Sequence, residues 1–167
     1  MKFFTQRLEL VPVTLAIIQA DLHRRDELPA LLNAALGKGW PPPLVDVAAM
    51  QRHKDAFIKD PDPGPWTSWY WITRQPRVLI GMSGFKSRPK DGVVEIGYSA
   101  IPPFQRRGYA TEAVTAMVEF AFANEVNCIA AETLPEIIAS QRLLLKCGFK
   151  SCGQGSEPGV IRFECCR

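Results

Sequence analysis

Apolar and polar positions alternate along several short stretches of the chain and recur with a helical period along others. Alternation predicts strands, because successive side chains of a strand point to opposite faces of a sheet. Pro and Gly clusters separate these stretches and predict turns between them. Strands are expected at residues 8–12, 66–73, 78–85, 93–101, 129–133 and 160–164.

Apolar residues three and four positions apart predict helices in the remaining segments. Thr14 has the side chain of an N-cap and precedes the first of them. The clearest helix lies at 110–124, where the apolar side chains fall on one face and Glu112 occupies the first turn. The other helices are expected at 16–22, at 28–36 with Gly37 and Gly39 ending it, at 46–59 and at 136–147.

This order of elements predicts a mixed α/β fold of the α+β class, with antiparallel strands first and a strand–helix–strand–helix unit later. The chain has 167 residues, which suits one domain spanning 1–167 and allows a core without metal or disulfide support. No apolar run is long enough to cross a bilayer, and the first ten residues lack a signal-peptide core. We therefore expect a cytoplasmic protein that contacts no membrane.

Charge and cysteine content narrow the possible partners. The formal net charge is +3, a mild excess that does not predict nucleic-acid binding. The five cysteines are odd in number and form no CxxC pair, and the chain has only two histidines. A metal site is therefore not expected, and reduced, buried thiols are the expected state. The cysteines are Cys128, Cys147, Cys152, Cys165 and Cys166.

The segment from Glu95 to Ala113 carries the strongest chemical signal. A strand runs into Pro-Pro, then into the basic turn Gln-Arg-Arg-Gly-Tyr-Ala, and then into the helix at 110–124. The first turn of a helix presents unpaired N–H groups, and Gly108 allows a ligand to approach the backbone. Arg106 and Arg107 add cationic donors. The pattern predicts a pyrophosphate site, whereas neither GxxxxGK[ST] nor a strand followed by GxGxxG is present.

These residues resemble a known family. The run from Gln105 to Ala110 is similar to the acyl-CoA pyrophosphate loop Q/R-x-x-G-x-G/A of the GNAT superfamily of N-acetyltransferases. The flanking Glu-Ile-Gly-Tyr and Thr-Glu-Ala, with Thr-Leu-Pro-Glu from Thr133 and Lys-Cys-Gly-Phe from Lys146, resemble its RimJ/RimL-like branch. The resemblance extends in order over nearly the whole chain, and it implies an acetyl-CoA-dependent N-acetyltransferase with no metal.

The resemblance also implies a fold and a cofactor site. The largely antiparallel sheet, flanked by helices on both faces, would splay at a bulged strand that holds Ser99, Ala100 and Ile101. The pantetheine arm of acetyl-CoA would bind the backbone of these three residues, and the side chain of Ser140 would contact the cofactor. The pyrophosphate would bind the backbone at Arg106, Arg107, Gly108, Tyr109, Ala110 and Thr111.

Two positions depart from the family pattern. Ile137 replaces the usual asparagine, and isoleucine cannot form its hydrogen bond, so weaker binding of the cofactor by about 1 kcal/mol is expected. Leu144 stands where other branches have a tyrosine general acid. We predict Glu95 as the general base acting through a water, and Ser140 as a donor to the departing thiolate. An acyl-enzyme on Cys147 is the less favoured alternative to direct transfer.

The acceptor side carries no motif. Trp40 and Trp71 are predicted to line the acceptor cleft, with core packing as the alternative. His53 is either a surface histidine or an acceptor-side base. The expected acceptor is a primary amine, either a protein N-terminus or a small molecule, and the chain is expected to be a monomer or a homodimer. The rival functions are an acyl-CoA sensor without catalysis and a nucleotide-binding regulator.

Overall fold

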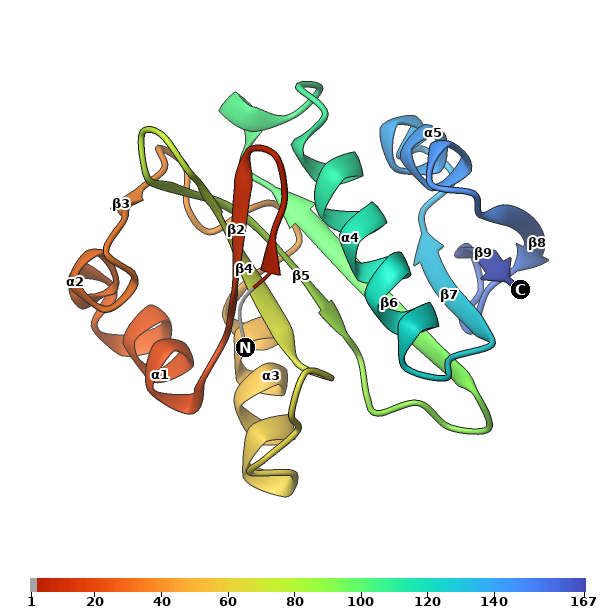
Figure 1. Ribbon diagram of the computed structural model, residues 1–167, viewed down its shortest axis with the longest axis horizontal. Helices are drawn as coiled ribbons and strands as arrows, with labels where there is room; N and C mark the ends of the chain where they lie inside the picture. Colours follow the sequence, from red (N-terminus) through yellow and green to blue (C-terminus); the bar gives the residue numbers. More distant parts are fainter. Residues whose placement is uncertain (1–2) are drawn as a thin grey trace.

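The computed structural model describes residues 3–167, so the first two residues of the predicted 1–167 domain lie outside the described residues (Figure 1). The elements follow one another in this order: β1 (Phe3–Phe4), β2 (Leu8–Pro12), α1 (Leu15–His23), η1 (Arg25–Glu27), α2 (Leu28–Leu32), β3 (Ala35–Leu36), α3 (Val47–Lys59), β4 (Ser68–Thr73), β5 (Val78–Phe85), β6 (Val93–Ala100), η2 (Pro102–Phe104), α4 (Tyr109–Ala123), β7 (Cys128–Thr133), α5 (Ile138–Lys146), β8 (Lys150–Gln154) and β9 (Ile161–Cys166).

The strands form one sheet in the order β1-β2-β4-β5-β6-β7-β9-β8, and β3 adds to β5. Pairing is antiparallel except between β6 and β7 and between β3 and β5. The parallel pair β6–β7 requires a crossover connection, which η2 and α4 supply. The sequence predictions of a largely antiparallel sheet and of the α+β class are therefore confirmed.

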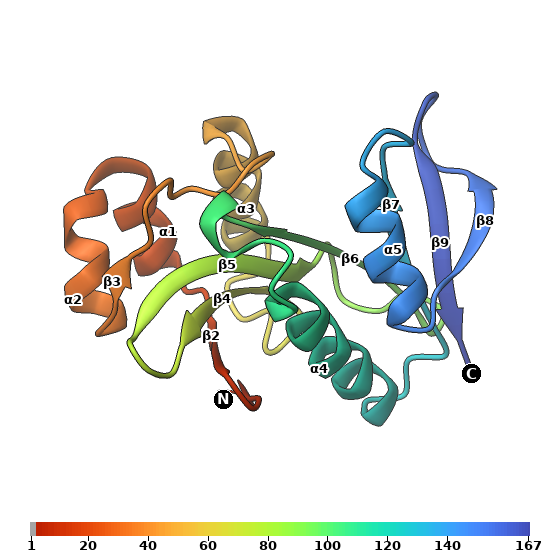
Figure 2. The same cartoon turned by 90° about the horizontal axis from the view of Figure 1, so that it is seen from above.

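Helices cover both faces of this sheet, as Figure 2 shows. On one face, α4 and α5 bury Val114, Met117 and Leu144 against β4–β7. On the other face, α1, α2 and α3 bury Ile18 and Met50, among others, against β4 and β5. None of the described helices is long and apolar enough to cross a membrane. The two faces thus have separate apolar cores, and side chains of the central strands alternate between them.

The helix predicted at 28–36 is shorter than expected. It ends at Leu32, because Asn33 adopts a left-handed conformation with φ of 48°. The following residues Ala35–Leu36 form β3 and pair in parallel with Val78 and Leu79 of β5. The prediction is therefore wrong for the last part of this segment, since the strand partner comes from a distant part of the sequence.

Besides β3, two further strands were not predicted, β1 and β8. All five residues of β8 are exposed, so the segment has no apolar alternation that could reveal it. It exists because it pairs with β9 at the edge of the sheet. The remaining predicted elements are confirmed, and Thr14 does accept a hydrogen bond from the Ile17 backbone N–H at 3.3 Å.

The register of the sheet shifts between β4 and β5. Trp71 pairs with Gly81 and Ile72 with Leu79, which leaves Ile80 as the extra residue. Strand β6 keeps a regular register with β5 from Ile96 to Ala100. The bulge predicted in the strand that holds Ser99 thus lies in its neighbour β5.

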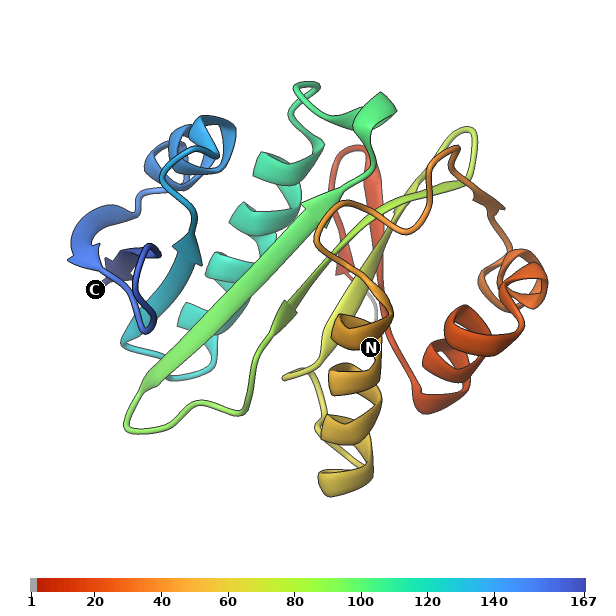
Figure 3. The ribbon, with the colours of Figure 1, turned by 180° about the vertical axis from the view of Figure 1, so that it is seen from behind.

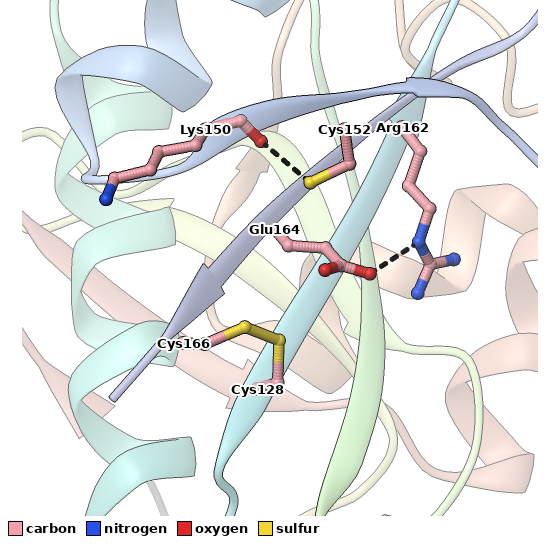
Figure 4. Close-up of a disulfide and its surroundings, with 6 residues drawn as sticks. All are labelled: Cys128, Lys150, Cys152, Arg162, Glu164 and Cys166. Atoms are coloured by element: carbon pink, nitrogen blue, oxygen red, sulfur yellow. Dashed lines mark hydrogen bonds and ion pairs between the residues drawn. A yellow bond between two sulfur atoms is a disulfide. The ribbon is translucent and has the colours of Figure 1, made fainter.

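The cysteines correct another expectation. Cys128 at the start of β7 pairs with Cys166 at the end of β9, and their sulfur atoms form a disulfide (Figure 4). Glu164 lies beside them, but a disulfide offers no thiolate to a metal ion. Cys152 is exposed, and Cys147 and Cys165 are half-buried. The expectation of five reduced, buried thiols is wrong because strand pairing aligns two cysteines 38 residues apart.

Candidate active site

Strands β6 and β7 separate part-way along their length. Their pairing runs from Val93 opposite Cys128 to Ile96 opposite Ala131, whereas β6 continues to Ala100. Figures 1 and 3 show the two strands diverging beyond this point. The expected splay between them is therefore present.

The direction of the backbone hydrogen bonds shows which groups of β6 this separation frees. Glu95 accepts a hydrogen bond from Lys86 and Ile101 donates one to Ile80, so these residues face β5. Because backbone groups alternate along a strand, Tyr98 and Ala100 face the other side. The Ala100 carbonyl there accepts a hydrogen bond from the Gln105 side chain at 2.7 Å. Of the predicted trio 99–101, only Ala100 presents its backbone to the splay, and Tyr98 joins it.

The start of α4 lies just beyond the same end of β6. Backbone N–H groups of residues 106–111 donate to no protein acceptor among residues 3–167, and the hydrogen bonds of the helix begin with the Glu112 N–H, which donates to the Gly108 carbonyl. Gly108 has φ of 83° and Arg106 has φ of 59°, so the chain turns sharply where the helix begins. Consecutive free N–H groups at a helix N-terminus form an anion site.

The N-terminal segment supports this turn. The Arg7 guanidinium donates from Nε to Glu112 at 2.7 Å and from Nη1 to the Arg107 carbonyl at 2.9 Å. It also lies 4.3 Å from the centre of the Tyr109 ring. Arg7 is not among the predicted site residues, because nothing near it in the sequence indicates a contact a hundred residues away. Arg106 and Arg107 themselves are exposed.

Glu112 serves this anchoring and is not free to bind a ligand. It accepts hydrogen bonds from the Thr5 hydroxyl and from the Arg7 backbone N–H, the latter at 2.7 Å. Burial by itself raises the pKa of Glu112, but the hydrogen bonds from Thr5 and Arg7 outweigh it and lower that pKa below its ordinary value.

Ser140 faces Tyr98 across the splay. Its hydroxyl lies 2.8 Å from the Tyr98 hydroxyl, and the Tyr98 hydroxyl also donates to the Ser140 carbonyl at 3.3 Å. Burial is the main reason that the pKa of Tyr98 is raised to about 12. Tyr98 therefore stays protonated at neutral pH and can hold Ser140 at the mouth of the splay.

A second feature, which we call the acceptor-side cleft, lies on the opposite face of β6. It has a volume of about 1230 Å³ and is lined by α3, the 63–68 segment, the second half of β5, the 86–90 loop and part of β6. Gly84 and Gly97 pair with each other at its base. Ser99 donates to the Pro43 carbonyl at 2.7 Å, which fastens the 41–45 loop to its edge.

Glu95 belongs to the same face of β6 as Gly97 and Ser99, since the three alternate along the strand. Its carboxylate forms an ion pair with the Lys86 ammonium. It is not among the residues that line the cleft. The predicted base Glu95 therefore lies outside the cleft lining and is already paired with the Lys86 ammonium.

Comparison with known proteins assigns this arrangement to a family. The pattern of the acetyltransferase (GNAT) domain matches residues 7–150. The chain belongs to the GNAT acetyltransferase family. The N-acetyltransferase YjdG of Bacillus subtilis is 24% identical over 147 residues, which is 87% of each chain.

Solved structures share the GNAT fold over the full chain. RimL, an α-N-protein acetyltransferase of ribosomal protein L7/L12 solved with coenzyme A, has a TM-score of 0.69 at 18% identity, with 99% of this chain and 98% of RimL covered. The ribosomal-protein-S5-alanine acetyltransferase of Vibrio fischeri has a TM-score of 0.70 at 14% identity, with 99% and 96% covered. The likeness to RimJ/RimL-like enzymes is thus one of fold.

The two tryptophans predicted to line the acceptor cleft of this GNAT domain do not line it. Trp71 is fully buried in the core on the α4 face, where its indole N–H donates to the Ser83 hydroxyl at 2.8 Å. Trp40 is partly buried and donates to the Asp21 carboxylate at 3.1 Å. The prediction for Trp71 is wrong because the strand turns its side chain to the α4 face, away from the cleft.

Leu144 and Cys147 supply neither a general acid nor an activated nucleophile. Leu144, at the position of the tyrosine in other GNAT branches, is fully buried. Cys147 is half-buried, and burial is the main reason that the pKa of its thiol is raised. A protonated thiol is a poor nucleophile at neutral pH.

Proposed function

We propose that this enzyme transfers an acetyl group directly from acetyl-CoA to a primary amine, which is a protein N-terminus or a small molecule. The observation that carries the proposal is the run of free backbone N–H groups at residues 106–111 beside the open edge of β6. An anion site and an unpaired strand edge thus meet at one end of the sheet.

The residues present fit coenzyme A at the start of α4. The N–H groups of residues 106–111 would bind the pyrophosphate, and Arg106 and Arg107 would add charge from the surface. Gly108 is exposed and has no side chain, so its backbone is accessible to a phosphate. A Cβ there would come within 3.2 Å of Arg7 Nη2.

The edge of β6 fits the pantetheine arm and the thioester. Tyr98 and Ala100 direct N–H groups toward the splay, and one of them would donate a hydrogen bond to the thioester oxygen. Such a bond strengthens as negative charge develops on this oxygen during attack by the amine. Ser99 and Ile101 would lie beside the bound pantetheine arm, although their own backbone groups face β5.

Glu95 and Ser140 would handle the protons. An α-amine has an ordinary pKa of about 7.7–8.0, so removal of its proton near neutral pH needs only a weak base. Glu95 would accept that proton through a water, provided that Lys86 releases its carboxylate. Ser140 would donate to the departing sulfur, and Tyr98 would hold the serine hydroxyl in place.

The proposal extends to the setting of the enzyme. It acts as one domain over 1–167 in the cytoplasm, as a monomer or a homodimer, without nucleic acid or membrane. Fractionation of intact cells tests the location, since recovery of the enzyme outside the cytoplasmic fraction would contradict it.

The decisive experiment measures release of free thiol from acetyl-CoA with a panel of amines that includes N-terminal peptides, lysine peptides and polyamines. Thiol release with formation of the acetylated amine is expected for at least one member. Tight binding of CoA without thiol release from any amine would instead indicate an acyl-CoA sensor. Thermal stabilisation by ATP that exceeds stabilisation by CoA would indicate a nucleotide-binding regulator.

A further inference from the structure

His53 lies on the acceptor side of the sheet and is held by a buried serine. It belongs to α3 and lines the acceptor-side cleft. Its Nδ1 lies 3.3 Å from the hydroxyl of Ser68, the first residue of β4. Ser68 is buried, so it fixes the direction of the imidazole ring.

A row of small residues connects His53 to the splayed strand. Ser68 pairs with Gly84, and Gly84 pairs with Gly97 of β6. Adjacent strands are about 4.8 Å apart, so the row spans about 10 Å. A Cβ on Gly97 would meet no atom within 4 Å, so the Gly97 end of this glycine floor is open, whereas a Cβ on Gly84 would lie 2.9 Å from the Ser68 hydroxyl oxygen. An amine placed there would lie between His53 and the edge of β6.

The protonation state of His53 suits a base. Burial, and to a smaller extent the charge of Arg52, lower its pKa below the ordinary 6.5. The other charged groups that line the cleft come from α3, from the 86–90 loop and from the loop before β9. They are Arg52, Lys59, Asp60, Lys86, Arg88, Lys90 and Glu157. The Arg88 hydrogen bond lowers the pKa of Asp60, so this carboxylate stays ionised at neutral pH.

Glu95 is less well placed for the same task. Its carboxylate pairs with Lys86, and it does not line the cleft. His53 has a hydrogen bond to Ser68 at one ring nitrogen and therefore keeps the other nitrogen for a substrate.

We propose that His53, in place of Glu95, is the catalytic residue that accepts the proton of the acceptor ammonium over the glycine floor, directly or through one water. This inference rests on the proposed function. The neutral amine then attacks the thioester carbon, the new C–N bond forms and the C–S bond breaks. The second amine proton passes through the Ser140 hydroxyl to the leaving sulfur, and the imidazolium returns the first proton to solvent.

The test is the pH dependence of kcat for His53→Gln, with acetyl-CoA and acceptor saturating. Glutamine can still hydrogen-bond to Ser68 but cannot accept a proton in this pH range. A fall in kcat of about 100-fold is expected, together with loss of the acid limb of the profile and a CoA affinity within about twofold of wild type. The loss should be larger for a lysine-type amine than for an α-amine, because the former needs more help to lose its proton.

Matched variants separate catalysis from packing. His23→Gln, at the end of α1, should leave kcat unchanged. Ser68→Ala should lower kcat while the acid limb remains, since the base is present but less well oriented. If His53→Gln fails to fold, restoration of the rate of His53→Ala by free imidazole provides the same evidence.

Two results would overturn this inference. One is a His53→Gln enzyme that keeps both the wild-type kcat and the acid limb of its pH profile. The other is a His53→Gln enzyme in which only the KM for the acceptor is raised. Either would leave the proposed acetyltransferase activity standing. A wild-type enzyme that releases no thiol with any amine would remove both proposals together.

Discussion

The hydroxyl groups of Tyr98 and Ser140 lie 2.8 Å apart and join β6 to α5 across the splay of the sheet. These residues are far apart in the sequence, and each belongs to a different side of the proposed thioester site. The contact therefore determines both the width of the splay at this point and the position of the serine hydroxyl.

Tyr98→Phe removes this hydrogen bond. We expect the KM for acetyl-CoA to rise about fivefold, which corresponds to about 1 kcal/mol. Ser140→Ala should have a similar effect on KM. In the double variant, the loss of binding free energy should be smaller than the sum of the two single losses, because each substitution removes the same hydrogen bond. Strict additivity in this cycle would contradict the pairing.

The raised pKa of Tyr98 also predicts that the free energy of unfolding falls at high pH. Its pKa is raised from 10.0 to about 12 in the folded protein. The associated stability is fully present below pH 10 and is lost as the pH rises from 10 to 12, because the unfolded chain then releases the proton more easily. The loss amounts to about 3 kcal/mol. Urea melts at pH 9 and 11.5 should differ less for Tyr98→Phe than for wild type.

Gly108→Glu tests the anion site. The added carboxylate would lie at the start of α4 and repel a phosphate, so we expect the Kd for CoA to rise about 100-fold or more. Gly153→Glu is the matched control, since Gly153 also has a positive φ, of 90°, and open space around it on the edge strand β8. Equal CoA affinity in the two variants, measured by calorimetry, would refute the site.

Glu112→Gln tests the anchoring of the N-terminal segment. Loss of the charge weakens the hydrogen bonds from Thr5 and Arg7, and we expect the free energy of unfolding to fall by about 1–3 kcal/mol. Glu119→Gln, at an exposed position of the same helix, should have little effect. Because the pKa of Glu112 is lowered in the folded state, its contribution is present above pH 4.5 and is lost as the pH falls through the folded-state pKa.

Ile137→Asn tests the departure from the family pattern. Ile137 precedes α5 and provides no side-chain cap to it. Asparagine should stabilise the apo enzyme by about 1 kcal/mol as an N-cap, and CoA binding should tighten by up to about fivefold. Ile137→Leu is the control without a polar group. Thermal melts without CoA and calorimetry with CoA separate the two effects.

Local signals in the sequence determined much of this protein. The helical period, the glycine after two arginines and the strand before Pro-Pro predict α4 and its anion-binding start, since these features depend on residues within one or two turns of each other. The same holds for the alternation that predicts most strands. Sequence similarity over nearly the whole chain gave the correct family as well.

Tertiary structure decided what depends on distant contacts. The strand pairing placed Trp71 in the core, shifted the bulge to Ile80, joined Cys128 to Cys166 and created β8 at a polar edge. It also brought Tyr98 to Ser140, Arg7 to Glu112 and His53 to Ser68, none of which has a local signature. Each of these contacts joins side chains from separate elements, and only packing of the whole sheet establishes which of them meet.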